Sequence, residues 1–198
     1  MIEKLATTET LHSNHWALYL AYGSNLHPYR LQQRIASSKL IARIEIPNHR
    51  ICFHKRGQDG SGKCDLVNGE YNDRCFGALY QMARSDIGEL DLIEAGYQRN
   101  NIQLELAGKQ CSGFTYQALP ELIDDRLQPF DWYHELISLG ADHLQINANH
   151  RDSLQQCTPL SDPESKRAEQ QRRLLQQLRS YNRNHSPVTL NSGRVISQ

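Results

Sequence analysis

The sequence predicts an α+β fold: a small mixed β-barrel-like domain with flanking helices and a C-terminal helical extension. Three observations support this fold class. Short strand-like runs recur between residues 16 and 117 with few helices between them, which argues against a doubly wound parallel sheet. Helical periodicity is limited to a few stretches. Beyond residue 162 the chain becomes basic and rich in glutamine, which is typical of a partly solvated helix.

The individual elements follow from hydrophobic periodicity and from helix start and stop signals. Strands are expected at six aromatic or apolar runs, namely Trp16–Tyr22, Leu40–Ile46, Arg50–Lys55, Cys75–Met82, Ile102–Leu106 and Cys111–Gln117. Helices are expected at Pro28–Ile35, Asp86–Glu94, Trp132–Leu139 and around Asp142–Gln155. We divide the chain into a polar segment 1–15, a main domain 16–160, and a C-terminal helix and tail 161–198.

The C-terminal segment starts with a clear helix signal, Asp162 followed by Pro163. Leu174, Leu178 and Tyr181 form a narrow apolar stripe, so we expect this helix to pack on the main domain or on a second subunit. A nucleic-acid-binding role for its basic face is the weaker alternative. The residues after Asn184 are expected to form a loose tail, or a short strand that docks elsewhere.

Composition excludes several function classes. The 198 residues carry no net charge, so no overall field favours nucleic acids or membrane surfaces. No apolar run approaches the length of a membrane span, and residues 1–15 lack the layout of a signal peptide. Five irregularly spaced cysteines suit free thiols in a reducing compartment. We therefore expect a cytoplasmic protein with no membrane or nucleic-acid partner.

The most informative stretch is Tyr19 to Leu26. An aromatic strand ends abruptly in Gly23-Ser24-Asn25, and Pro28 stands where the first turn of a helix would begin. A strand that breaks at glycine and leads into a helix leaves backbone N–H groups free to hold a carboxylate or an oxyanion. On this turn alone, an ordinary strand–helix connection is an equally good interpretation.

A second segment, Leu90 to Tyr97, ends a short amphipathic helix that Ser85 or Asp86 can cap. Glu94 falls in its last turn, where the helix dipole disfavours a carboxylate. This position and partial burial should raise the pKa of Glu94, as a general base requires. The alternative is a solvated surface glutamate.

Together these motifs resemble the γ-glutamylcyclotransferase family, which has the AIG2-like fold. Tyr22 to Asn25 match its Tyr-Gly-Ser-Asn signature, and Leu90, Asp91 and Glu94 match its Leu-Asp-x-x-Glu signature. Tyr133 precedes Gly140-Ala141 with the spacing of the family's substrate-contacting tyrosine. The resemblance extends from near Leu18 to near Leu154, and three motifs in order are far more specific than any one of them.

The resemblance implies a barrel-like enzyme that cyclises a γ-glutamyl compound to 5-oxoproline without a metal or cofactor. It implies that Glu94 is the general acid and base. The residues implied to bind substrate are Tyr19, Leu20, Ala21, Tyr22, Gly23, Ser24, Asn25 and Tyr133. The leaving group stays open between an amino acid, an amine and the cysteinylglycine part of glutathione. A non-catalytic binding domain is the alternative from another class, and a homodimer is consistent with the family.

Because all these motifs precede Leu154, we expect removal of the chain from Pro163 onward to leave catalysis largely intact. Rival motifs are weaker. Gly57 to Cys64 resembles a phosphate-binding P-loop but lacks the final hydroxyl, and predicts a flexible loop. Zinc binding is disfavoured because Cys52, His54, Cys64 and Cys75 include no C-x-x-C pair. Ser24 lacks a nucleophile elbow, so we expect it to contact substrate through its hydroxyl.

Overall fold

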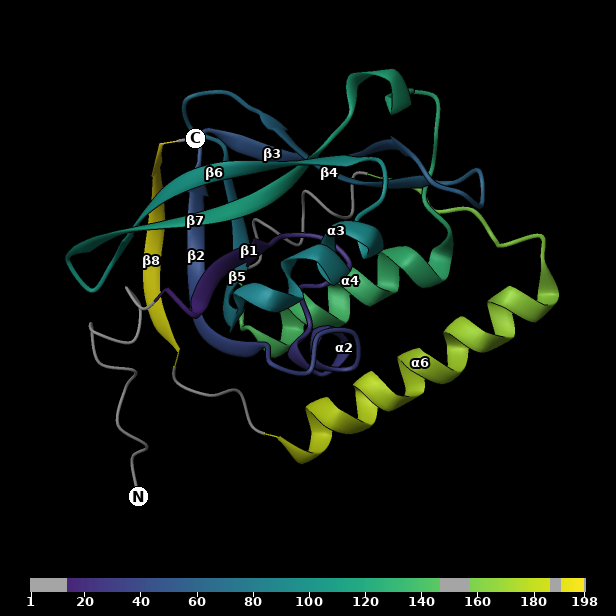
Figure 1. Cartoon of the computed structure of the whole chain (residues 1–198). Coiled ribbons are helices and arrows are strands. Elements are labelled where there is room, and N and C mark those ends of the chain that lie inside the picture. The colour runs from purple at the N-terminus through teal and green to yellow at the C-terminus, as the bar shows by residue number, and fades with distance from the viewer. Residues whose placement is uncertain (1–13, 147–156, 186–189, 198) are drawn as a thin grey trace.

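The computed structural model describes residues 14–146, 157–185 and 190–197 (Figure 1). Strands and helices are mixed along the chain, with β2 to β5 following one another directly. In chain order the elements are β1 (Trp16–Ala21), α2 (Pro28–Gln32), β2 (Lys39–Pro47), β3 (His49–Arg56), β4 (Gly62–Asn68), β5 (Arg74–Ala83), η1 (Arg84–Asp86), α3 (Ile87–Ile93), β6 (Tyr97–Leu106), β7 (Lys109–Ala118), η2 (Pro120–Leu122), α4 (Asp131–His143), α6 (Ser165–Asn184) and β8 (Asn191–Ser197). Most of segment 1–15 and most of the helix expected around Asp142–Gln155 lie outside the described residues.

Within these ranges six strands close into a barrel in the order β1-β5-β2-β8-β6-β7, and β7 returns to pair with β1. The pairs β2–β8 and β7–β1 are parallel, and the other neighbours are antiparallel. Strands β3 and β4 form a separate two-stranded sheet, and α4 and α6 lie beside the barrel (Figure 1). This arrangement confirms the predicted mixed barrel with flanking helices and a C-terminal helix.

Strand β1 lies at the centre of the core, as its aromatic and apolar run predicts. Residues Ala17 to Ala21 are all 7% exposed or less and belong to the hydrophobic core, and β5 and β7 pair with the two edges of the strand. The Tyr19 ring stacks on Phe114 with ring centroids 5.4 Å apart. The two faces of the strand are therefore buried, and the turn that follows starts from a rigid base.

Strand β4 was not predicted. The flexible loop expected from Gly57 to Cys64 is confined to a turn, in which Gly57 N donates to Ser61 O at 2.9 Å and Gly60 has a φ of 80°. Gly62 then begins β4, whose register with β3 pairs Arg56 with Gly62. The loop prediction was wrong beyond Ser61 because pairing with β3, a tertiary contact, overrides the local glycine signal.

The C-terminal residues belong to the same folded unit. Helix α6 packs on α4, and its residues Leu175 and Leu178 are 3% and 0% exposed in the common hydrophobic core. Strand β8 then enters the barrel between β2 and β6. For the residues after Asn184 the sequence left open a loose tail or a short docking strand, and the structure shows the strand, which forms part of the barrel wall.

Candidate active site

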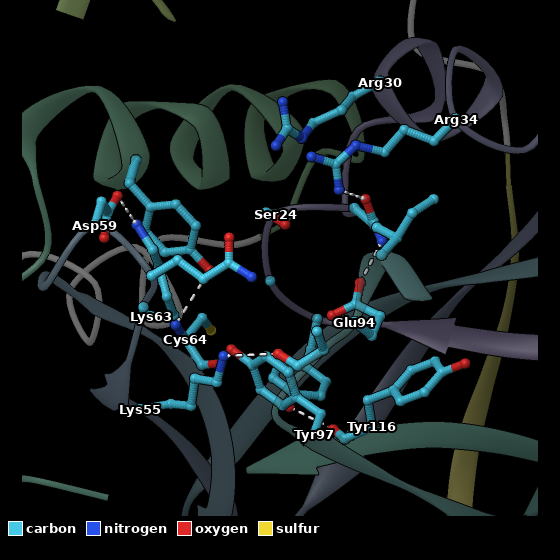
Figure 2. A pocket seen from close by; sticks show the side chains of 18 of the residues that line it. Ser24, Arg30, Arg34, Lys55, Asp59, Lys63, Cys64, Glu94, Tyr97 and Tyr116 are labelled. Carbon is cyan, nitrogen blue, oxygen red and sulfur yellow. Dashed lines mark hydrogen bonds and ion pairs between the residues drawn. The ribbon is translucent and has the colours of Figure 1, made fainter. Parts of the chain in front are cut away.

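A pocket of about 460 Å³ lies where the turn after β1 meets α2, the β3–β4 sheet, the end of α3, α4 and α6 (Figure 2). Most residues assigned to the site from sequence line it, namely Tyr19, Tyr22, Gly23, Ser24, Asn25, Glu94 and Tyr133. Leu20 and Ala21 do not; they are 0% and 1% exposed in the barrel wall. The Leu20 carbonyl there accepts a hydrogen bond from Thr115 at 2.9 Å. The fold therefore brings two of the sequence motifs and Tyr133 to one cavity.

The turn after β1 presents backbone donors to this cavity. Leu26 N donates to Gly23 O at 2.9 Å and closes the turn. No hydrogen bond to a described residue uses the N–H of Gly23, Ser24 or Asn25. These groups are the ones from which the sequence predicts an anion site, and the pocket leaves room for an anion beside them.

Helix α2 begins directly after this turn. Pro28 occupies its first turn, as predicted, and the His27 side chain caps it by accepting from Tyr29 N at 3.2 Å. The helix has only five residues, so its dipole is small and individual N–H groups are the donors that matter.

Gly23 is a glycine because of a close contact. A Cβ built on it would lie 3.1 Å from Cys64 Cβ and 3.8 Å from the Tyr133 hydroxyl. The backbone of the turn thus passes directly against β4 and against α4. A side chain at this position would push the turn into the cavity.

Glu94 ends α3, as its motif predicts. Its N–H donates to Leu90 O at 2.9 Å, and Gly96, with a φ of 84°, turns the chain into β6. The ammonium of Lys55 donates to Ala95 O at 2.9 Å. The segment that carries the carboxylate is therefore held from both sides, by α3 and by β3.

The Glu94 carboxylate is held by side chains from the other motif. Its Oε1 accepts from Asn25 Nδ2 at 2.6 Å. Arg34 donates to Asn25 Oδ1 at 3.1 Å (Figure 2), and this bond orients the amide so that its NH₂ group faces Glu94. Asn25 is only 2% exposed, whereas Glu94 is half-buried at the wall of the pocket, so the amide end of this hydrogen bond is shielded from water.

Burial raises the pKa of Glu94 above that of an ordinary glutamate, as the sequence predicts. The nearby cations Arg34, Lys55 and Arg30 and a hydrogen bond from Tyr19 act in the opposite direction. The site therefore combines desolvation, which favours the protonated acid, with charges that favour the carboxylate. A group balanced in this way can both accept and return a proton.

Three tyrosines of the pocket differ in the use of their hydroxyl groups. Tyr22 donates to Tyr116 O at 2.5 Å, and Tyr97 donates to Cys64 O at 2.7 Å. Tyr133 instead accepts from Cys64 N at 3.1 Å, and no described residue accepts its own proton. Tyr133 can therefore donate a hydrogen bond to a ligand, whereas Tyr22 is held in the wall.

Sequence reasoning missed most of the basic and amide side chains of the pocket, namely Arg30, Arg34, Lys55, Gln58, Lys63, Arg167 and Gln171. Two pairs were visible in principle. Arg167 and Gln171 lie four residues apart in α6, which places them on one helix face. Arg30 and Arg34 have the same spacing in the predicted helix Pro28–Ile35, although α2 ends at Gln32 and Arg34 follows it in a turn. The sequence motifs all precede Leu154, so nothing in the sequence indicated that Arg167 and Gln171 of α6 line the pocket.

The rival motifs have other roles in the structure. Lys63 of the P-loop-like stretch binds Asp59 at 2.7 Å, and the stretch continues as a strand, not as the helix that a P-loop requires. His54 lies between Asp65 and Asp125 at 3.0 and 2.8 Å. Among the described residues, no group of three histidine, cysteine or acidic side chains is arranged to hold a metal ion. No helix in the described ranges is long and apolar enough to span a membrane.

Neither the models of known protein families nor the sequences of curated proteins match this chain. Solved structures do. A γ-glutamyl cyclotransferase matches with a TM-score of 0.70 at 19% identity, covering 82% of this chain and 99% of that one. An uncharacterised human protein matches with a TM-score of 0.70 at 20% identity and the same coverage. YkqA from Bacillus subtilis matches with a TM-score of 0.59 at 18% identity, and the match covers 73% of this chain and 54% of YkqA.

These likenesses show that the chain has the fold of γ-glutamyl cyclotransferase over most of its length. The expectation about the fold that the sequence motifs raised is therefore confirmed.

Proposed function

We propose that this chain is an enzyme that cyclises a γ-glutamyl compound to 5-oxoproline and releases the attached amine or amino acid. The observation that carries the proposal is the 2.6 Å hydrogen bond between Asn25 and Glu94, since it joins the two motifs in one pocket. The shared fold with a γ-glutamyl cyclotransferase supports the same conclusion. A binding domain without catalysis is the competing hypothesis.

The reaction needs few protein groups because the substrate carries its own nucleophile. The α-amine closes a five-membered ring on the γ-carbonyl carbon, and the pocket supplies proximity by selecting the folded conformer. Glu94 accepts a proton from the α-ammonium group, which frees the lone pair for attack. Its pKa, raised by burial, makes it a stronger base than an exposed glutamate.

Attack produces a tetrahedral centre with a negatively charged oxygen. The N–H groups of Gly23, Ser24 and Asn25 are the donors proposed to stabilise this oxyanion or the α-carboxylate. The hydroxyl of Tyr133 donates a further hydrogen bond that orients the substrate. Protonated Glu94 then gives its proton to the departing nitrogen as the C–N bond breaks and the γ-carbonyl forms again. The regenerated Glu94 carboxylate accepts the second proton of the ring nitrogen, which leaves 5-oxoproline as a neutral lactam, and passes this proton to the released amine, which becomes an ammonium ion.

Chromatographic detection of 5-oxoproline tests the proposal. The panel contains γ-glutamyl dipeptides, γ-glutamylamines and glutathione, so that it also identifies the leaving group. Release from at least one class, dependent on enzyme concentration, is expected. Binding of 5-oxoproline without any release from the panel would instead support the non-catalytic domain.

A further inference from the structure

Arg30 is a buried cation that has no counter-ion among the described residues. It lines the pocket and is 9% exposed. Its Nε has no hydrogen-bond partner, and no described residue forms an ion pair or side-chain hydrogen bond with its guanidinium group. Buried charges are normally paired because desolvation is costly. An unpaired guanidinium in a cavity wall therefore indicates that a ligand supplies the partner.

The other basic side chains of the pocket are already engaged. Arg34 donates to the Asn25 amide, Lys55 to Ala95 O, Lys63 to Asp59, and Arg167 to Asp162. Within the described part of the chain, Arg30 is the exception among these five. Figure 2 shows it next to Arg34 at the wall of the pocket formed by α2.

The surroundings of Arg30 disfavour its positive charge. Burial, and then the charge of Arg34, lower the pKa of Arg30 to about 9. The side chain remains a cation near neutral pH, with Glu94 acting on it in the stabilising direction, but no salt bridge joins the two. A ligand anion would supply the missing counter-charge.

A second buried polar atom of the pocket, Gln171 Oε1, also has no hydrogen-bond partner among the described residues and indicates that the ligand carries an N–H group. Four buried side-chain atoms among the described residues have no partner, and two of them, Arg30 Nε and Gln171 Oε1, line this pocket. One is a donor and the other an acceptor. A molecule that carries both a carboxylate and an N–H group complements the pair.

We propose that Arg30 determines substrate specificity by binding a carboxylate of the γ-glutamyl substrate through its guanidinium group. The inference rests on the proposed function and deepens it. Every γ-glutamyl compound has an α-carboxylate, and a γ-glutamyl amino acid has a second carboxylate on its leaving group. A planar guanidinium matches either one with two parallel hydrogen bonds.

The test compares wild type with Arg30→Met, which removes the charge and keeps much of the volume. Two substrates are used: γ-glutamylalanine and γ-glutamylethylamine, whose leaving groups differ by one carboxylate. Loss of a charged hydrogen-bond pair should lower kcat/KM about tenfold or more, mainly through KM. Equal loss for both substrates assigns Arg30 to the α-carboxylate, and loss for γ-glutamylalanine alone assigns it to the leaving group.

Stability provides the readout that distinguishes binding from a structural role. Because Arg30 is an uncompensated buried charge in the free protein, Arg30→Met should be as stable as wild type or more stable. Arg30→Lys should recover part of the activity, and Arg50→Met, a change at an exposed position of β3, should change neither property. A folded Arg30→Met with kcat/KM within twofold of wild type for both substrates would overturn the inference.

Calorimetric titration with 5-oxoproline and with L-glutamate separates this inference from the proposed function. Turnover by wild type with unchanged kinetics in Arg30→Met rejects the inference alone. Absence of turnover rejects the proposed function, and the titration then decides about Arg30. Binding by wild type that weakens about tenfold in Arg30→Met supports the carboxylate site, whereas equal binding, or no binding by wild type, rejects it.

Discussion

The Glu94 carboxylate and the Asn25 amide, which lie 69 positions apart in the sequence, are joined by a hydrogen bond of 2.6 Å. Asn25 can donate in this direction because Arg34 occupies its carbonyl oxygen. The carboxylate is thereby fixed beside the turn whose N–H groups face the cavity. The geometry of the proposed proton transfer thus depends on a three-residue chain from Arg34 through Asn25 to Glu94, and each link can be tested.

Glu94→Gln should remain folded, because the two side chains are nearly isosteric, and should lose about two orders of magnitude or more in the rate of 5-oxoproline release. The amide cannot take the proton of the α-ammonium. Glu89→Gln is the matched control, since Glu89 lies on the exposed face of the same helix. A cooperatively folded Glu94→Gln with near-normal turnover would contradict the mechanism.

Gly23→Val should abolish most activity, and Gly23→Ala should reduce it. The reason is space: the added Cβ would stand 3.1 Å from Cys64 Cβ, so the turn must move and its N–H groups with it. Gly88→Ala serves as control, because nothing lies within 4 Å of a Cβ at that helical position. Turnover and thermal unfolding are measured for all three variants. Full activity in a folded Gly23→Val would rule out a role of the turn in the site.

The pH dependence of kcat/KM should show an acid limb governed by Glu94. Its pKa is raised by burial, and only the carboxylate can act as base, so the rate should fall as the pH decreases through a value above that of an ordinary glutamate. Arg34 lowers the pKa of Glu94. Arg34→Gln should therefore move the limb to higher pH, whereas Arg194→Gln, on the far strand β8, should leave it in place. Coincident limbs in all three proteins would disprove the assignment.

The free energy of unfolding should decrease in acid because His27 resists protonation in the folded protein. This side chain is 0% exposed and lies between α2 and α6. Its ring accepts from Tyr29 N and therefore donates through Nε2 to Asn182 at 3.0 Å. Burial lowers its pKa from 6.5 to about 4. The pKa of His27 is thus lower in the folded protein than in the unfolded chain. Neutral His27 therefore adds about 3 kcal/mol to the free energy of unfolding above about pH 6.5, and this contribution is lost as the pH falls toward about 4.

Urea unfolding of wild type and His27→Asn across this pH range measures the effect. Asparagine can still cap α2, so the variant should fold, with a lower free energy of unfolding at neutral pH and a flatter acid dependence. Parallel pH profiles for the two proteins would show that His27 does not titrate in this window.

The C-terminal residues should be essential to the fold, contrary to the expectation that catalysis survives their removal. Truncation before Pro163 deletes β8 and exposes the edges of β2 and β6, so circular dichroism should show no cooperative unfolding. Leu178→Ala, at a fully buried position of α6, should cost about 2–5 kcal/mol of stability. Lys166→Ala, at an exposed position of the same helix, should cost little. A folded and active truncated protein would contradict this prediction and would show that the main domain ends before residue 161.

Local sequence determined the parts of this protein that depend on local physics. The aromatic run of β1, Pro28 at the start of α2 and Gly96 two residues after Glu94 each specify their own backbone conformation, so these elements could be predicted. The two signature motifs also predicted Glu94 at a helix end and Gly23 in a sharp turn, as the structure has them, because such positions require particular residue types in consecutive positions.

Tertiary structure decided which distant segments meet. Strand β8 has no strong pattern of its own and is a strand because it pairs with β2 and β6. In the sequence Arg30 looks like an ordinary helical arginine, and only the fold shows that it is enclosed with no counter-ion among the described residues. Gln171 belongs to the pocket because α6 packs across α4. Burial and pairing are sums over contacts between distant residues, and these quantities, not local propensity, set the charge balance of the cavity.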